Sequence, residues 1–311
     1  MKIVLLDKET LGSVDLSLFA QFGDFTAYDI TPKSETLNRV KDADIIITNK
    51  VIIDKFIIQN SKNLKLICIA ATGMNNVDLD SAKKEGVEVK NVAGYSTTSV
   101  TQATFTLLFT LIGSSCYYDQ YVKSGLWSKS PIFTNLKREF FEINGKTWGI
   151  IGLGDIGKSV ARVATSFGAN VIYYSTSGVN RDHKYQRKSL NDLLENSDII
   201  SIHAPLNAKT DNLIKQDEFL KIKKGAIILN MGRGGIVNES DLAYAIDNFG
   251  ILAGLDVSKT EPINSSNPLL HVEQKDSIIF SPHTAWASKE ARERLVKMVA
   301  NNIKNFIKGE E

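Results

Sequence analysis

The chain has 311 residues, of which 43% are hydrophobic and 23% are charged, the balance of an ordinary globular protein. Its 37 basic and 35 acidic residues leave a formal charge of +2. That charge argues against a nucleic-acid-binding protein, which would carry a basic patch or tail. The length exceeds what one hydrophobic core usually serves, so we expect two domains.

The sequence predicts neither a membrane-spanning helix nor a metal site. The most apolar stretch, residues 104–113, is shorter than the roughly 18 residues that a membrane-spanning helix needs. The two cysteines, Cys68 and Cys116, have neither a second cysteine nearby nor a metal-ligand spacing. We predict that both are buried thiols of a cytoplasmic protein that binds no metal.

The first hundred residues alternate between strand-like apolar runs and helical patterns. Strands are predicted at residues 2–7, 25–30, 44–49, 64–70 and 87–92. Helical patterns separate them, for example at residues 78–86, which begin with Asp and end with Gly. Continuous apolar strands that alternate with helices indicate a parallel sheet covered on both faces.

A long helix is predicted over about residues 97–122, and a polar, irregular segment follows it. The alternation of strands and helices then restarts, and a helix over residues 287–309 ends the chain. The second set of strands is predicted at residues 147–152, 170–175, 198–203, 226–231, 251–257 and 277–282. Two α/β modules therefore lie in tandem.

Because the last helix follows a strand that ends at Pro282, we expect it to return to the first module. The predicted architecture is an α/β protein of two domains. Residues 1–97 and 285–311 form a smaller, flavodoxin-like parallel-sheet domain for the substrate. Residues 98–284 form a Rossmann-type doubly wound domain for a dinucleotide.

A glycine motif follows the first strand of the second set. Gly152, Gly154 and Gly157 have the G-x-G-x-x-G spacing, between a strand and a helical pattern that ends at Gly168. In this context the first glycine permits a tight turn, the second lets the backbone approach a pyrophosphate, and the third lets helix and strand pack closely. The motif predicts a dinucleotide site at the helix N-terminus.

The next strand ends at Ser175, where NAD sites commonly have an acidic residue that bonds the ribose hydroxyls. Without that carboxylate the 2′-phosphate of NADP meets no like charge. Ser175, Thr176 and Ser177 can donate hydrogen bonds to it, and Arg181 or Lys184 can reach its charge. The sequence favours NADP(H) slightly, and NAD(H) stays open because serine can also bond a ribose hydroxyl.

Three further stretches lie where strands are predicted to end, which is where ligands bind in such sheets. "NMGRGG" places Arg233 between glycines, where its guanidinium can meet a ligand carboxylate. "GLDVSKTEP" contains Asp256 and Glu261, and "SPHTAWAS" contains His283, one of four histidines. Alone, His283 is more readily a packing residue. Together with an arginine and a carboxylate, it becomes a candidate proton-transferring group of an enzyme.

These motifs resemble those of the D-isomer-specific 2-hydroxyacid dehydrogenase family, and within it the glycerate dehydrogenases, also called hydroxypyruvate reductases. The resemblance covers essentially the whole chain. It rests on "NVAGYSTTSVTQATFTLL", "EINGKTWGIIGLGDIG", "HAPLNAKT", "NMGRGGIVNE", "GLDVSKTEP" and "SPHTAWAS".

The resemblance implies an NAD(P)-dependent oxidoreductase that interconverts a D-2-hydroxy acid and its 2-keto acid. Glycerate with hydroxypyruvate, or glycolate with glyoxylate, are the implied substrates, and D-lactate and phosphoglycerate dehydrogenases stay open as alternatives. The apolar stripe of the helix near 97–122 separately predicts a dimer surface and hence a homodimer. No nucleic-acid or membrane partner is expected.

The resemblance also implies roles for single residues. His283 is the implied acid–base group, Glu261 its partner and Arg233 the substrate-binding residue, with backbone N–H groups around Thr72 and Gly73 for the substrate carboxylate. Asp256 is implied to lie near the nicotinamide carboxamide. The residues expected to contact the cofactor are Val100, Gly152, Gly154, Asp155, Ile156, Gly157, Ser175, Thr176, Ser177, His203, Ala204, Pro205, Thr210, Met231, Gly232, Arg233, Asp256 and His283.

The other histidines, His183, His203 and His271, are interpreted as structural or solvated, and His203 as lining the cofactor site through its backbone. The alternative function is a dinucleotide-sensing regulatory protein on the same scaffold. Such a protein needs no complete proton-transfer set, so the presence of Arg233, Glu261 and His283 together favours the enzyme.

Overall fold

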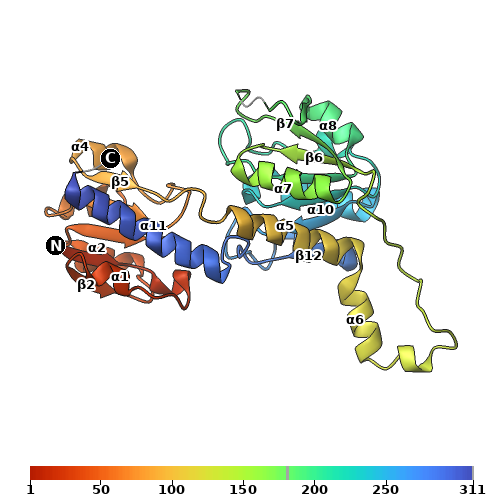
Figure 1. Cartoon of the computed structure of the whole chain (residues 1–311), viewed down its shortest axis with the longest axis horizontal. Coiled ribbons are helices and arrows are strands. Elements are labelled where there is room, and N and C mark those ends of the chain that lie inside the picture. The colour runs from red at the N-terminus through yellow and green to blue at the C-terminus, as the bar shows by residue number, and fades with distance from the viewer. Residues whose placement is uncertain (180–181, 310–311) are drawn as a thin grey trace. The chain divides into compact units, whose positions relative to one another are not determined.

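The structure, a computed structural model, describes residues 1–179 and 182–309. The chain divides into two compact units (Figure 1). Unit 1 comprises Met1–Ser96 and Trp286–Glu311, and unit 2 is the continuous stretch Thr97–Ala285. Each unit is built on its own parallel sheet, which confirms the predicted α/β class.

Unit 1 contains a five-stranded sheet in the order β2-β1-β3-β4-β5. Its strands are β1 (Lys2–Leu5), β2 (Asp24–Ala27), β3 (Ile45–Thr48), β4 (Leu66–Ile69) and β5 (Glu88–Lys90). Its helices are α1 (Ser17–Ala20), α2 (Thr36–Val40), α3 (Lys55–Asn60), α4 (Leu79–Lys84) and α11 (Lys289–Lys308), with short 3₁₀ turns at Lys8–Leu11 and Lys33–Glu35.

Both faces of this sheet are buried, which is why its strands are continuous apolar runs. Ile3 and Ile45 pack on the face that α11 covers, whereas Val4 and Ile46 pack on the opposite face, in one cluster with Ile57 of α3. The helix α11 begins at its cap Ser288, whose side chain accepts a hydrogen bond from the Ala291 N–H, and ends at Gly309. It contributes Leu295, Val299 and Ile303, one helical turn apart, to the core.

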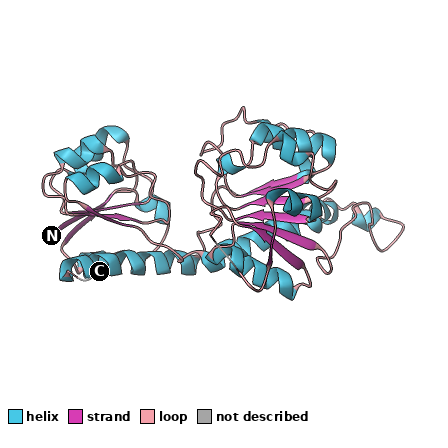
Figure 2. Ribbon diagram, turned by 90° about the horizontal axis from the view of Figure 1, so that it is seen from above, coloured by secondary structure: helices cyan, strands magenta, loops and turns pink. Residues whose placement is uncertain are grey.

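Unit 2 contains a seven-stranded parallel sheet in the order β12-β11-β10-β9-β6-β7-β8, with helices on both faces (Figure 2). Its strands are β6 (Thr147–Ile151), β7 (Asn170–Tyr174), β8 (Gln186–Arg187), β9 (Ile199–Ile202), β10 (Ile227–Asn230), β11 (Leu252–Leu255) and β12 (Ile278–Phe280). Its helices are α5 (Thr97–Ile112), α6 (Ser115–Lys123), α7 (Asp155–Ser166), α8 (Leu190–Asn196), α9 (Gln216–Phe219) and α10 (Glu239–Phe249). The strand order reverses between β6 and β9, and such a switch point is where doubly wound sheets bind ligands.

The helix predicted over residues 97–122 is two helices, because Gly113 and Ser114 separate α5 from α6. Ser114 has φ of 44°, in the left-handed region that a helix cannot contain. The apolar stripe of α5 is internal: Phe105, Leu108 and Leu111 are at most 6% exposed. Phe109 of the same helix is the exception, because it is 39% exposed, so a small part of the stripe reaches the surface.

The helix α6 projects from the rest of unit 2, together with the chain that follows it (Figure 1). None of its residues is buried. Cys116 is consequently exposed, so the predicted burial of this thiol is wrong, whereas Cys68 in β4 is buried as predicted. Among the described residues, no helix is both long and apolar enough to cross a membrane.

Candidate active site

The turn between β6 and α7 has the geometry of a dinucleotide site. Gly152 has φ of 92°, which L side chains rarely adopt, and a Cβ on Gly157 would lie 2.3 Å from the Gly152 carbonyl oxygen. Gly154 faces open space instead, since a Cβ there would meet no atom within 4 Å. The helix α7 then begins at Asp155. The turn thus presents backbone without a side chain beside a helix N-terminus, a fit for a pyrophosphate.

The segments that follow β9 and β10 approach this turn closely. A Cβ on Gly152 would lie 3.0 Å from the backbone of His203, and one on Gly232 would lie 2.7 Å from the Ala204 carbonyl oxygen. Met231, also expected at the cofactor, is 7% exposed. The structure therefore brings three of the predicted cofactor segments together at the switch point.

Thr210 shapes the loop that follows β9. Its hydroxyl donates to the Pro205 carbonyl oxygen at 2.7 Å and accepts from the Asn207 N–H at 2.9 Å. The residue is fully buried. Thr210 thus stabilises the conformation of the loop, and its hydroxyl forms its hydrogen bonds with backbone groups of the protein. Val100, also expected at the cofactor, is a 6% exposed residue of α5.

The imidazole of His203 is enclosed within unit 2. Its Nε2 lies 3.0 Å from the Ser201 hydroxyl, which accepts a hydrogen bond from the Trp148 indole at 2.9 Å. Burial lowers the pKa of His203 to about 3. His203 therefore stays neutral at physiological pH, whereas His183 is exposed and His271 bonds the Ser265 carbonyl on the surface.

Arg233 lies in the turn after β10, and the buried side chain of Asn230 holds this turn. The Asn230 amide accepts from the Gly232 N–H at 3.1 Å and donates to the Arg233 carbonyl oxygen at 2.9 Å. The guanidinium donates to the Gly232 carbonyl oxygen at 2.8 Å. Within residues 1–179 and 182–309 no carboxylate forms an ion pair with Arg233. Its remaining donors suit a ligand carboxylate.

Gly234 brings a second loop against the Arg233 turn. A Cβ on Gly234 would lie 2.0 Å from the Ser258 carbonyl carbon and 2.2 Å from the Lys259 nitrogen, so only glycine fits there. The carboxylate of Glu239 accepts from the Lys259 N–H at 2.7 Å and fixes the same loop. This is the loop that carries Glu261.

Glu261 and His283 form a direct pair. The His283 Nδ1 lies 2.7 Å from Glu261 Oε2, and the other carboxylate oxygen accepts from the Ser258 N–H at 3.2 Å. Both side chains are partly exposed, at 24% for the histidine and 37% for the glutamate. A carboxylate on Nδ1 fixes the tautomer of the ring, so that Nε2 is the nitrogen that can exchange a proton with a ligand.

Asp256 holds the loop on which His283 lies. The carboxylate is 3% exposed and accepts from the Ser281 hydroxyl at 2.5 Å, from the Thr284 N–H at 2.9 Å and from the Ala285 N–H at 3.0 Å. Burial, the largest effect, raises the pKa of Asp256 above its ordinary value, although these hydrogen bonds and the charge of His283 oppose the rise. Both oxygens contact the loop, since Oδ2 also lies 3.2 Å from the Ala285 nitrogen.

Thr72 and Gly73 belong to unit 1, in the turn after β4. The Thr72 hydroxyl donates to the Val92 carbonyl oxygen at 3.0 Å, and the Asn91 amide donates to the Thr72 carbonyl oxygen at 2.7 Å. These bonds fix the turn and engage no backbone N–H of either residue.

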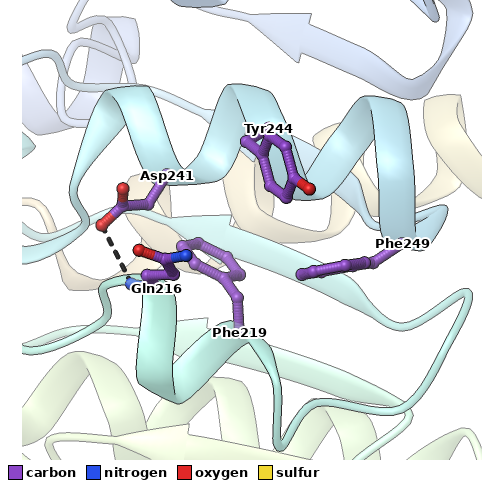
Figure 3. A pocket seen from close by; sticks show the side chains of 5 residues that line it. All are labelled: Gln216, Phe219, Asp241, Tyr244 and Phe249. Atoms are coloured by element: carbon purple, nitrogen blue, oxygen red, sulfur yellow. Dashed lines mark hydrogen bonds between the residues drawn. The ribbon is translucent and has the colours of Figure 1, made fainter.

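A separate pocket of unit 2 lies between α9 and α10 (Figure 3). Its lining residues are Gln216, Phe219, Asp241, Tyr244 and Phe249. The Asp241 carboxylate accepts from the Gln216 N–H at 2.9 Å at the start of α9, so this acid has a structural partner. No predicted site residue lines the pocket.

The comparisons with known proteins agree with this geometry. Residues 105–285, more than half of the chain, match the family described as D-isomer specific 2-hydroxyacid dehydrogenase, NAD binding domain. The chain belongs to the D-isomer-specific 2-hydroxyacid dehydrogenase family.

Individual relatives of this dehydrogenase align over nearly their whole length. A hydroxypyruvate reductase of Blautia hydrogenotrophica is 35% identical over 99% of this chain and 98% of that protein. A glycerate dehydrogenase of Methylorubrum extorquens is 34% identical over 99% of this chain and 96% of that protein. A solved structure of an acyclic imino acid reductase in complex with NADPH and D-Arg has a TM-score of 0.88 at 29% identity, covering 100% of this chain and 98% of its own.

Sequence reasoning missed the residues that support the site of this dehydrogenase. Asn230 scaffolds the Arg233 turn, and Ser281 bonds the carboxylate of Asp256. The Ser99 hydroxyl donates to the Ala285 carbonyl oxygen at 2.6 Å and anchors the same loop. Asn230 and Ser281 each lie near the end of a predicted strand, and that position is the signal that pointed to them.

Proposed function

We propose that this family member reduces a short 2-keto acid, hydroxypyruvate or glyoxylate, to the D-2-hydroxy acid and catalyses the reverse oxidation. The observation that carries the proposal is the 2.7 Å contact between His283 Nδ1 and Glu261 Oε2, in the unit that also contains the dinucleotide turn and Arg233. The names of the two relatives that are 34% and 35% identical support the substrate class.

Different groups supply the hydride, bind the substrate carboxylate and transfer the proton. A bound nicotinamide dinucleotide supplies the hydride. Arg233 binds the substrate carboxylate and orients the carbonyl group. His283 donates the Nε2 proton to the carbonyl oxygen, and Glu261 stabilises the imidazolium that exists before this transfer. In the reverse direction the neutral ring accepts the hydroxyl proton.

We also propose unit 2 as the cofactor domain and unit 1 as the substrate domain. The glycine turn supports the first assignment. The second rests on the resemblance, which implies the backbone N–H groups of Thr72 and Gly73 as donors to the substrate carboxylate. The fixed turn around Thr72 suits that task, since donors held in place lose little entropy on binding.

The test of the proposed function is turnover of a panel of 2-keto acids with NADH and NADPH side by side. Hydroxypyruvate and glyoxylate are expected to give the highest kcat/KM, with pyruvate lower. Binding of either dinucleotide without turnover of any keto acid would instead establish a dinucleotide-sensing regulatory protein.

The cofactor is proposed to be NADP(H) in preference to NAD(H). Ser175 directly follows β7, is 4% exposed, and its hydroxyl lies 3.5 Å from that of Ser177. The nearby carboxylate of Asp182 accepts from the Lys184 and Tyr185 N–H groups within its own turn. The residues directly after β7 therefore present serine hydroxyl groups, and the carboxylate of Asp182 already has hydrogen-bond partners. Arg181, also expected here, lies outside the described residues.

Replacing Ser175 by aspartate is expected to weaken NADPH binding at least about 10-fold and to leave NADH binding equal or tighter, because the new carboxylate repels the 2′-phosphate and can bond ribose hydroxyls. Cofactor fluorescence titrations measure both dissociation constants. Ser175→Asn, of the same size without the charge, is the matched control. Equal effects of Asp and Asn on NADPH would show that the strand end does not meet the phosphate.

We propose that two copies associate through the segment formed by residues 115–142, here called the arm. The hydroxyl of Tyr118 donates to the Arg138 carbonyl oxygen at 2.9 Å, which ties the end of the arm to its start. Ile132, Phe133 and Leu136 are nevertheless 60%, 88% and 79% exposed. An apolar hollow of the same unit, lined in part by Phe109 and Phe167, can receive such side chains from a second copy.

Phe133→Asp with Leu136→Asp is expected to convert the dimer to a monomer, because two charges would be buried without partners. Light scattering coupled to size-exclusion chromatography measures the mass. Ile30→Asp, at a 65% exposed residue of unit 1, is the control and should leave the mass unchanged. A parental chain that is monomeric at every concentration would refute the proposed dimer.

A further inference from the structure

The backbone of His283 is strained. Its φ is 54°, in the left-handed region that residues with a Cβ rarely adopt. A strained residue persists only where its surroundings determine the conformation, so contacts around His283 must hold it. Its own N–H is bonded to two carbonyl oxygens, of Asp256 at 2.8 Å and of Ser281 at 2.9 Å.

The residues on either side of His283 are held by one carboxylate. Asp256 Oδ1 accepts from the Ser281 hydroxyl before the histidine, and from the Thr284 and Ala285 N–H groups after it. The carboxylate therefore closes a ring of hydrogen bonds around the loop of residues 281–285. Within this ring, Ser281 donates through its side chain, whereas Thr284 and Ala285 donate through their backbone N–H groups.

From this geometry we infer that Ser281 is a positioning residue: its hydroxyl and the carboxylate of Asp256 form a latch that keeps the His283 ring aimed at the reacting atoms. The inference rests on the proposed function, since it assigns the latch to the acid–base group.

The hydroxyl matters for two physical reasons. The Ser281 hydroxyl bonds the start of the loop to Asp256 Oδ1. The same oxygen accepts from Thr284 and Ala285 at the end of the loop, so the two ends of the loop are held together. The hydroxyl also stabilises the charged form of a buried carboxylate, and burial already favours the neutral form of Asp256. A neutral carboxyl accepts fewer hydrogen bonds, so loss of the hydroxyl weakens the bonds to Thr284 and Ala285 as well.

Ser281→Ala is expected to lower kcat roughly 10- to 100-fold, because small misplacements of a reacting group are costly, with KM and the dissociation constant of NADPH changed less than about twofold. Ser281→Thr, which keeps the hydroxyl, should restore kcat. Ser197→Ala is the matched control: Ser197 is fully buried in the same unit and donates to the Leu193 carbonyl oxygen at 2.6 Å. It should lower the melting temperature and leave kcat unchanged.

A second readout does not depend on turnover. Amide hydrogen exchange at Thr284 and Ala285 should become roughly 10-fold faster in Ser281→Ala, since the latch protects both N–H groups. If the parental chain turns over no keto acid, the proposed function fails while the exchange rates still test the latch. Asp256→Asn, which removes the charge at the same size, gives the same test where Ser281→Ala does not fold.

Three results would overturn the inference. They are a parental kcat in Ser281→Ala, unchanged exchange at Thr284 and Ala285, and a Ser281→Thr enzyme as slow as Ser281→Ala. Weaker binding of NADPH at unchanged kcat would likewise overturn it, because Ser281 would then act on the cofactor and not on His283.

Discussion

Replacing His283 by alanine is expected to lower kcat for keto-acid reduction by about 10²–10⁴-fold, the usual contribution of general acid–base catalysis. The variant loses the proton donor to the carbonyl oxygen and keeps the glycine turn, so the dissociation constant of the dinucleotide should stay the same. Steady-state kinetics and cofactor titration measure the two quantities. A kcat within about threefold of the parental value would exclude His283 as the acid–base group.

Glu261→Gln is the companion variant, because it retains a hydrogen-bond acceptor for Nδ1 and removes the charge that stabilises the imidazolium. We expect a smaller loss than for His283→Ala. The carboxylate also orients the ring through Nδ1, so the loss should appear in kcat and leave the dissociation constant of the dinucleotide unchanged. A Glu261→Gln enzyme with the parental kcat would contradict the coupling of the pair.

Replacing Arg233 by lysine is expected to lower kcat/KM for the keto acid about 10- to 150-fold, the equivalent of roughly 1.5–3 kcal/mol for one lost hydrogen bond to a charged group. Lysine retains the charge but not the planar pair of donors that fits a carboxylate. Most of the loss should appear in KM.

The matched control for this variant is Arg162→Lys, at an exposed residue of α7 in the same unit. It should leave kcat/KM unchanged. An Arg233→Lys enzyme with a parental KM would show that another group binds the substrate carboxylate.

Where a residue is tied to a strand end or to a fixed glycine spacing, the sequence alone predicts its place in the candidate site. Arg233, Asp256 and His283 each lie at or just after the end of a predicted strand, and parallel strands end at one edge of a sheet, so the sequence predicts that they lie near one another. Gly157 was predicted to let helix and strand pack closely, and it does so against the carbonyl group of Gly152.

The rest of the candidate site depends on contacts between residues that are distant in the sequence. A periodic pattern of apolar residues does not predict such contacts. Ser99 bonds Ala285 across 186 positions, and Ser281 bonds Asp256 across 25. The break in the long helix was missed for a different reason. A single glycine lowers helix stability only by about 1 kcal/mol, so Gly113 did not outweigh the helical pattern around it.

The insertion of unit 2 into unit 1 determines when each unit can become complete during synthesis. Unit 2 emerges from the ribosome as one uninterrupted stretch and can fold as soon as Ala285 is released. The last strand of the unit 1 sheet ends at Lys90, but Leu295, Val299 and Ile303, which cover one face of this sheet, are made only after unit 2. At ordinary elongation rates that face stays uncovered for roughly 10 to 40 s. The nascent sheet of unit 1 is therefore the part of the chain that needs protection from aggregation, and a chaperone that shields it until α11 is made should raise the yield of folded protein.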